Sequence, residues 1–323
     1  MRSVLKKSDS NVIALSFLIV VILIAMALFM PDRFYTMSNL RSIVFQFPEY
    51  GVLAFGVMAC MISGGIDISL VGIANLSGVI AATIMLGMGK SNLSIVLGIL
   101  AALATGLLAG LFNGSLIGFL RLPPMLVTLC GSQLYAGLAL IITKGPALND
   151  LPDNYKFIAN GSIGQIPVVL FVFIAVLVFV YFVMNRTVFG RQVRFMGSNY
   201  EAARYSGINN LKTTLRCYAF SGLMGAISGI LMSSHFNSAK SDYGTQYTLF
   251  SILIVVLGGV HPDGGRGRVA GVTLSIILLQ FITQLFTFLR IDTNYRTSAY
   301  GFILISVLVI TMISDKRRLR RMT

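Results

Sequence analysis

The side chains that could carry protons or bind a charged solute are few, and they lie at the edges of long apolar runs. Glu49 and Asp67 lie near the two ends of one such run, and His235 and His261 lie at the ends of others. In lipid, an ionisable side chain near the middle of a helix typically marks an ion or proton route. Because none of these four lies in the middle of a run, we expect no proton relay, and we interpret the two histidines as interfacial residues.

The chain has no motif for nucleotide hydrolysis, zinc binding or acyl transfer. It lacks the phosphate loop G-x-x-x-x-G-K-[ST], a Cys/His cluster with zinc spacing and a G-x-S-x-G nucleophile elbow. Its three cysteines, Cys60, Cys130 and Cys217, lie in or beside apolar runs, so we interpret them as small packing residues. We therefore expect no metal ion or cofactor on this chain, and a membrane enzyme or receptor is the least favoured class.

The elements that position these residues are long apolar helices. Hydrophobic residues make up 56% of the 323 residues and charged residues only 11%, proportions typical of membrane proteins. A spanning helix needs roughly 20 mostly apolar residues. The candidate runs are Val12–Met30, Ile43–Ser63, Ile68–Met88, Ser94–Leu120, Pro124–Ile142, Val168–Met184, Thr213–Met232, Tyr247–Val260, Val269–Leu289 and Thr297–Ile313. The sequence thus predicts an all-α polytopic membrane protein with about ten transmembrane helices, the short eighth run being no simple straight span.

The distribution of charge predicts the orientation. With the N-terminus in the cytosol, ten spans place most Lys and Arg residues, including the basic C-terminal tail, on the cytosolic side, as the positive-inside rule requires. Both termini are then cytosolic. The formal net charge of +14 is explained by this orientation and by contact with anionic lipid, so nucleic acid is not an expected partner.

One polar, basic segment, residues 185–212, lies between two apolar runs on the cytosolic side. Within it, Gly197–Gly207 resembles a short helix with both ends encoded. Ser198 and Glu201 have the S-x-x-E spacing of a capping box, and Gly207 is placed to end the helix. A helix this short has no large apolar face to bury, so we predict a docking site for another protein. Because the chain lacks a phosphate loop, active transport would draw its energy from a partner.

Two glycine-rich breaks lie on the same side of the membrane. Ser63–Ser69 (SGGIDIS) has two open interpretations: a tight turn in which glycines end one helix and Asp67 caps the next, or a hinge at the mouth of a pathway. Leu257–Arg268 does not follow a strand, so a phosphate-binding loop is disfavoured. We expect instead a loop packed near the predicted docking helix.

Polar and small residues also occur inside the runs. The amides either bond between helices or line a polar route; they are Asn75, Asn113, Gln133, Gln280 and Gln284. Glycines recur at every fourth position of the fourth run and predict close helix packing there; they are Gly106, Gly110, Gly114 and Gly118.

Several motifs occur together in a fixed order from about residue 40 to the C-terminus. They are Ser63–Ser69, Asn113-Gly114, Leu122-Pro123-Pro124, Val127-Thr128-Leu129, Phe189-Gly190-Arg191, Glu201–Arg204, Ser206–Ile208, Val256–Gly259 and Gly264–Gly267. In this order the chain resembles the permeases of ribose-type ABC importers, which carry monosaccharides or, in some relatives, the signal autoinducer-2. The resemblance implies a type II importer permease fold in a bacterial inner membrane, with residues 1–323 as one permease domain and spans over 12–313.

The resemblance also implies partners and site residues. The expected partners are a tandem-domain ATPase that holds ATP-Mg, a second permease, an extracytoplasmic binding protein and a small neutral sugar. The predicted ATPase-coupling residues are Gly197, Ser198, Glu201, Ala202, Ala203, Arg204 and Gly207. The candidates for the translocation path or gate are Gly64, Gly65, Asp67, Asn75, Asn113 and Gln133. The alternative function is a secondary, ion-coupled sugar transporter, which the lack of mid-span carboxylates disfavours.

Overall fold

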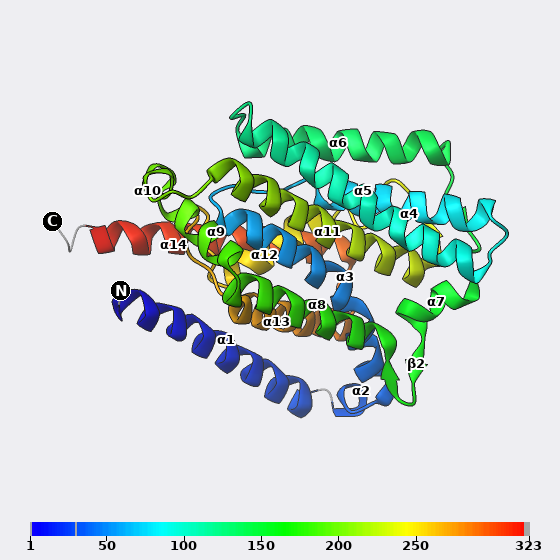
Figure 1. Cartoon of the computed structure of the whole chain (residues 1–323). Helices are drawn as coiled ribbons and strands as arrows, with labels where there is room; N and C mark the ends of the chain where they lie inside the picture. The colour runs from blue at the N-terminus through cyan, green and yellow to red at the C-terminus, as the bar shows by residue number, and fades with distance from the viewer. Residues whose placement is uncertain (1, 30, 320–323) are drawn as a thin grey trace.

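The computed structural model is a bundle whose long helices run side by side (Figure 1). It describes residues 2–29 and 31–319, with side chains at 12–29, 31, 34–39, 41–292 and 294–309. Within this part of the chain, eight helices are long and apolar enough to cross a membrane. They are α1 (Arg2–Phe29), α3 (Met37–Ile62), α4 (Leu70–Gly87), α5 (Asn92–Gly118), α6 (Pro124–Thr143), α8 (Val168–Arg186), α11 (Asn210–Phe236) and α13 (Val269–Phe288).

The remaining elements are shorter or lie at the ends of the bundle. The helices are α2 (Pro31–Phe34), α7 (Asp153–Asn160), α9 (Val188–Ser198), α10 (Tyr200–Tyr205), α12 (Tyr247–Leu257) and α14 (Thr293–Leu319). Two antiparallel ladders pair β1 (Leu148–Asn149) with β4 (Ser238–Ala239) and β2 (Ser162–Ile163) with β3 (Ile166–Pro167). The fold is therefore mainly helical, and the strands serve only to fasten loops at one end.

Several predicted runs differ in their bounds from the observed helices, and two of these differences bear on the site. α3 begins at Met37, earlier than the predicted Ile43, because Thr36 caps it by accepting the backbone N–H of Asn39 at 3.3 Å. α12 has 11 residues and ends before Gly258, which is too short to cross a bilayer that takes roughly 20 residues. The expectation that the eighth run is no simple straight span is confirmed.

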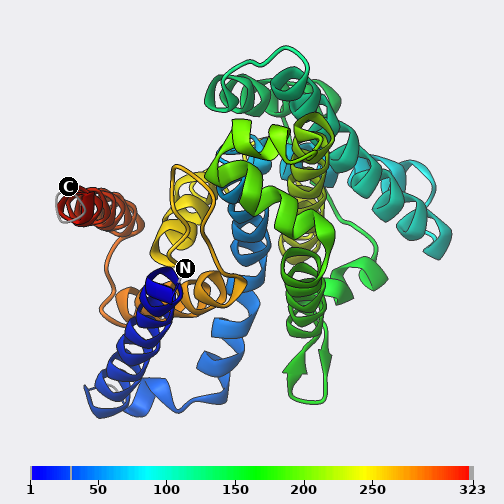
Figure 2. The ribbon, with the colours of Figure 1, turned by 60° about the vertical axis from the view of Figure 1, so that its left-hand side comes forward.

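The centre of the bundle is formed by α3 and α11. In Figure 2, α1 and α14 lie at one side and α4, α5 and α6 at the other, with α3 and α11 between them. α11 packs against α3, α4 and α5, while α12 and α13 cover another face of α3. The fully buried side chains include Leu53, Phe55 and Met58 of α3 and Cys217 of α11.

Close contact between α5 and α11 depends on the predicted glycines. A Cβ at Gly106 would overlap the carbonyl oxygen of Gly222, and one at Gly110 would overlap that of Tyr218. Only glycine lets the two backbones approach this closely. The predicted packing role of this stripe is confirmed.

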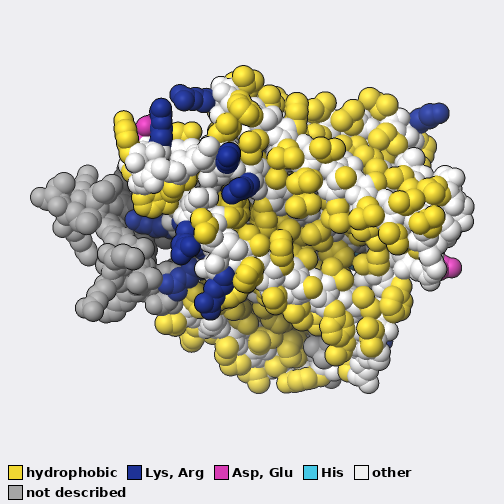
Figure 3. All heavy atoms as spheres, in the orientation of Figure 1, with side chains coloured by type: hydrophobic (Ala, Val, Ile, Leu, Met, Phe, Trp, Pro, Cys, Tyr) yellow, Lys and Arg dark blue, Asp and Glu magenta, His cyan; other side chains and the backbone are white. Residues whose placement is uncertain are grey.

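The two ends of the bundle differ in character. The start of α1, the end of α14, α9 and α10 lie together at one end, and α7 and β2 at the other (Figure 1). On the face seen in Figure 3, Lys and Arg side chains gather over α9 and α10, while hydrophobic side chains cover the body. This is the arrangement that the predicted topology requires, with the basic end in the cytosol.

Candidate functional site

The segment 185–212 forms two helices instead of one. Ser198 is the last residue of α9, where its hydroxyl donates to the carbonyl oxygen of Arg194 at 2.9 Å. The N-cap of α10 is Asn199, whose Oδ1 accepts the backbone N–H of Ala202 at 2.9 Å. The predicted capping box of Ser198 and Glu201 is therefore wrong. Asparagine is as good an N-cap residue as serine. The extended backbone of Asn199 (φ −162°) ends α9 and separates it from α10.

The end of α10 agrees with the sequence. Gly207 has a φ of +80°, its N–H donates to Arg204 O at 3.1 Å, and the N–H of Ile208 donates to Ala203 O at 3.0 Å. This is the pattern of a Schellman motif, which favours glycine at the left-handed position. The prediction that Gly207 ends the helix is confirmed.

α10 presents one face to solvent and one to the bundle. Ala203 is fully buried, and Asn210 at the start of α11 donates to Tyr200 O at 2.9 Å, which holds the helix against the protein. Glu201 and Arg204 are exposed, and Tyr205 is 88% exposed. The sequence pattern did not single out Tyr205, although a large exposed aromatic side chain is a typical binding anchor.

Three backbone segments meet beside the end of α9. The N–H of Gly265 donates to Ile62 O at 2.8 Å, and a Cβ at Gly197 would overlap Ile62 O and lie 2.7 Å from Gly265 N. A Cβ at Gly264 would lie 2.7 Å from the Cα of Gly64 and 2.9 Å from Gly197 O. We call this contact of residues 62–64, 197–198 and 264–265 the glycine junction. The loop after α12 is thus packed near the docking helix, as predicted.

A buried polar network begins at Asp67, three residues after Gly64 of this junction. Asp67 accepts the N–H and the hydroxyl of Ser69, at 2.9 and 2.6 Å, and the hydroxyl of Ser221 at 2.8 Å. Asn113 donates to the Ser69 hydroxyl at 2.8 Å and accepts the hydroxyl of Tyr135 at 2.8 Å. All five side chains are buried. The network joins the α3–α4 turn to α5, α6 and α11.

The α3–α4 segment is the tight turn of the first interpretation, but Asp67 does not cap α4, because the N-cap is Ser69 and no side chain caps this helix. Gly65 N–H donates to Cys60 O at 3.0 Å, Gly64 has a φ of +87°, and Asp67 accepts a backbone N–H two residues ahead of it, immediately before α4. Gly65 is also closely packed, because a Cβ there would lie 2.5 Å from the hydroxyl oxygen of Tyr218 and 3.3 Å from Pro124. A hinge at this turn remains a prediction.

The other predicted path residues lie apart from this network. Asn75 donates to the backbone oxygens of Ser241 and Tyr243 at 2.9 and 3.0 Å, which fastens the loop before α12 onto α4. Gln133 lies on the exposed face of α6. Of the predicted path residues, the structure therefore places Gly64, Gly65, Asp67 and Asn113 together, with Asn75 and Gln133 elsewhere.

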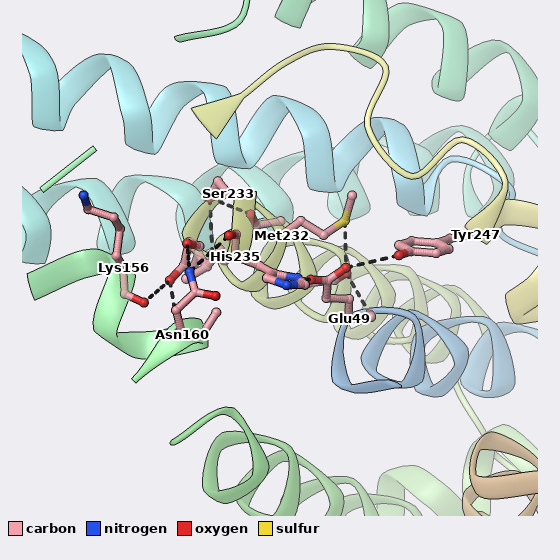
Figure 4. A network of polar contacts seen from close by, with 12 residues as sticks. Glu49, Lys156, Asn160, Met232, Ser233, His235 and Tyr247 are labelled. Carbon is pink, nitrogen blue, oxygen red and sulfur yellow. Dashed lines mark hydrogen bonds and ion pairs between the residues drawn. The ribbon is translucent and has the colours of Figure 1, made fainter. Parts of the chain in front are cut away.

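A second buried polar cluster was not predicted. Figure 4 shows Glu49 of α3 between His235 at the end of α11 and Tyr247 at the start of α12. One carboxylate oxygen lies 2.5 Å from His235 Nδ1, and the other accepts the Tyr247 hydroxyl at 3.3 Å. Because α3 starts at Met37, Glu49 lies near the middle of the helix and is only 2% exposed. The sequence places Glu49 near the outer end of its run, and the structure shows it buried between the end of α11 and the start of α12.

Amide side chains continue this cluster along α3 and α13. Gln280 accepts the hydroxyl of Tyr50 and donates to Gln46 Oε1 at 3.3 Å, and Gln284 donates to Asn39. These are the helix–helix hydrogen bonds expected of in-span amides. Within the described part of the chain, no three His, Cys, Asp or Glu side chains gather where a metal ion could bind.

Removing Asp67 is expected to destabilise the bundle. Asp67→Ala leaves three donors from Ser69 and Ser221 without their partner in a buried site, at a cost of about 2–3 kcal/mol. The apparent melting temperature of the purified protein in detergent should fall by about 4 °C or more. Ser115→Ala is the control, because that exposed hydroxyl donates only to its own helix. Equal melting of the two variants would contradict the role of the network.

These features describe a helical protein with eight candidate membrane spans and an exposed basic segment at one end of the bundle. Residues 39–312 match the family described as "Branched-chain amino acid transport system / permease component", and the chain belongs to this family of ABC permeases. It is therefore a multi-pass membrane subunit of a bacterial ABC importer, and the resemblance found in the sequence is confirmed.

Similar proteins match over nearly the whole chain. The ribose import permease protein RbsC of Bacillus subtilis is 31% identical over 94% of this chain and 92% of its own length. The autoinducer 2 import system permease protein LsrD of Yersinia enterocolitica is 30% identical over 88% and 87%. The L-arabinose transport system permease protein AraH of Escherichia coli is 29% identical over 92% and 89%. No solved structure matches the chain. By family, an ATPase and a binding protein complete such a system.

Proposed function

We propose that this chain is the permease subunit of an importer for a monosaccharide or a similar small, neutral, polyhydroxylated solute. The observation that carries the proposal is the near full-length similarity to permeases named for ribose and L-arabinose. The amides and hydroxyls between the helices, such as the half-buried Gln46 and the buried Tyr50 and Gln280, are groups that bind hydroxyl-rich solutes without needing a charge on them. Autoinducer-2 is the second candidate, favoured by the similarity to the permease named for it.

The energy for transport comes, in this proposal, from a tandem-domain ATPase bound to α9 and α10. The exposed face of α10, with Glu201, Arg204 and Tyr205, enters a cleft of the ATPase, and the buried face transmits its movement to the bundle through the glycine junction. A second permease, identical or homologous, and an extracytoplasmic binding protein complete the transporter. In this proposal the chain crosses the membrane ten times with both termini in the cytosol. α14 and the interrupted segment around α12, whose helix is itself too short to span, supply the two crossings beyond the eight candidate helices.

The buried Glu49–His235 pair reopens the alternative of an ion-coupled transporter, because a carboxylate buried between the helices is a feature of such mechanisms. Family membership favours ATP as the energy source. If an uncoupler abolished uptake by the intact transporter while ATP was held constant, the ion-coupled alternative would be supported instead.

The docking assignment is tested by Tyr205→Ala. Loss of a central aromatic anchor is expected to weaken binding of the ATPase by about 10-fold or more, measured by titrating the purified ATPase onto the permease in nanodiscs. Tyr35→Ala is the matched control, since Tyr35 is also highly exposed but precedes α3 at the opposite end of α1. Unchanged affinity in Tyr205→Ala, with Tyr35→Ala also unchanged, would remove α10 from the interface.

The solute is identified on the assembled complex. ATP hydrolysis is measured with the cognate binding protein loaded in turn with ribose, L-arabinose and autoinducer-2. We expect several-fold stimulation by one sugar. Stimulation by autoinducer-2 alone would select the second candidate, and no stimulation by any of the three would contradict the proposed substrate class.

A further inference from the structure

α12 is a short helix bounded by glycines at both ends. It is preceded by Gly244, with a φ of +60°, and followed by Gly258 and by Gly259, with a φ of +79°. Left-handed glycines at both boundaries let the flanking backbone change direction at low cost. Interrupted helices of this kind line the substrate routes of many transporters. α12 is therefore an element that can move as a unit between two hinges.

The outer end of α12 closes the buried carboxylate cluster. Tyr247 is its first residue, and its hydroxyl donates to Glu49, which also binds His235. The ring of Tyr247 lies 5.7 Å from that of Tyr50, and Phe250, one turn further on, lies 4.9 Å from Tyr50. α3, α11 and α12 are thus held together at one place by a single carboxylate (Figure 4). The ring contacts of Tyr50 add to the contact between α3 and α12.

The inner end of α12 leads directly into the glycine junction. The loop that follows it is compact: His261 N–H donates to Arg266 O at 3.1 Å, and Gly264 N–H donates to His261 O at 3.0 Å. Through Gly264 and Gly265 this loop contacts the last residues of α9, Gly197 and Ser198. One continuous stretch of chain therefore joins the docking segment to the Glu49 cluster at the other end of α12.

We propose that Glu49, His235 and Tyr247 form the outer gate of the translocation route, and that α12 opens it when the docking segment moves. The inference rests on the proposed function and deepens it. In the closed state the carboxylate is satisfied by the imidazole and the tyrosine hydroxyl. When α12 withdraws Tyr247, the carboxylate and the neighbouring amides, Gln46 and Gln280, become available to solute hydroxyls. An unpaired buried carboxylate is costly, so the gate closes again once the solute has passed.

The test uses Ser251→Cys as a reporter of gate opening. Ser251 lies one turn after Tyr247, is 2% exposed and donates only to the backbone of its own helix. The exposed Cys130 is replaced by serine, while Cys60 and Cys217 stay because they are buried. Intact spheroplasts are treated from outside with a membrane-impermeant maleimide, and the labelling rate at position 251 is measured.

Breaking the gate is expected to raise this rate. Glu49→Gln and His235→Gln should each increase labelling by about 10-fold or more, and the double variant should not exceed the larger single effect, because both remove one shared interaction. Tyr155→Phe is the matched control: it also breaks buried hydrogen bonds to α11, to Ile230 O and Ser233 Oγ, without contacting α12. Each variant is checked for an unchanged gel-filtration profile.

Two results would overturn the gate. One is labelling in Glu49→Gln and His235→Gln equal to that of the Ser251→Cys parent. The other is an equal rise in Tyr155→Phe, which would indicate general loosening. Because this labelling needs neither ATPase nor substrate, it stands apart from the proposed function.

The link to the docking segment is tested in the complex with the ATPase. ATP should raise labelling at position 251, and Gly197→Ala should abolish that rise. If the ATPase binds but ATP leaves the labelling rate unchanged, the gate inference fails and the proposed docking of the ATPase stands. If Tyr205→Ala leaves ATPase binding unchanged, the docking assignment fails.

Discussion

Gly197→Ala is expected to uncouple the permease from its ATPase, with binding-protein-stimulated ATP hydrolysis falling about 10-fold or more. The physical reason is steric: the new Cβ would overlap the carbonyl oxygen of Ile62 and lie 2.7 Å from Gly265 N. These are backbone atoms at the end of α3 and in the loop after α12, which cannot move aside without breaking the 2.8 Å hydrogen bond between them. The end of α9 must then lift from the bundle.

A second measurement on Gly197→Ala needs no partner. In inside-out vesicles, trypsin should cut at Arg194 and Arg204 several times faster than in the wild type, because α9 and α10 lose their contact with the bundle at the glycine junction. Gly87→Ala is the control: it ends α4, and nothing lies within 4 Å of its Cβ position. Wild-type cleavage rates together with wild-type ATPase stimulation would show that the junction carries no coupling.

Gly222→Val is expected to prevent close packing of α5 on α11 and to cost about 3 kcal/mol or more. A Cβ at Gly222 would overlap the carbonyl oxygen of Gly106 and lie 3.0 Å from the Cα of Gly110. Because α11 is the central helix of the bundle, separating it from α5 also disturbs its contacts with α3 and α4. The apparent melting temperature in detergent should fall by about 5–10 °C, or the protein should fail to elute as a single species.

Gly137→Val separates this packing effect from the intrinsic effect of replacing glycine by valine in a helix. Gly137 lies within α6, and nothing lies within 4 Å of its Cβ position. The small change in helix propensity is similar in the two variants, so only Gly222→Val should lose several kcal/mol. Similar melting temperatures for both would show that the α5–α11 contact is not the source of stability.

The spans could be predicted because their signal is local. Hydrophobicity over roughly 20 residues decides whether a helix lies in lipid, and each run carries that signal alone. The glycine stripe of α5 is also visible in the sequence, because the glycines recur at a regular spacing. The role of Gly207 is predictable because it depends on the backbone conformation of that residue alone. The loop after α12 was also placed correctly near the docking segment, because both lie on the cytosolic side of the predicted topology.

Boundaries and caps were less predictable. Ser198 and Asn199 are both good capping residues, and the sequence pattern alone favoured Ser198. In the structure the N-cap is Asn199, because Ser198 is still part of α9. The end of α9 packs through Gly197 against the backbone of Ile62 and Gly265. A contact with two distant segments thus decided which of two adjacent residues begins α10.

By itself, the sequence determined the class of protein, the placement of most of the apolar runs, the basic segment between two of them and the family. Only the tertiary structure decided which buried polar groups meet. Glu49 and His235 are separated by 186 positions, and no local pattern distinguishes a carboxylate at a helix end from one that a histidine on another helix satisfies. Transfer into lipid acts on each helix separately, whereas the pairing of a buried carboxylate depends on how all the helices pack together.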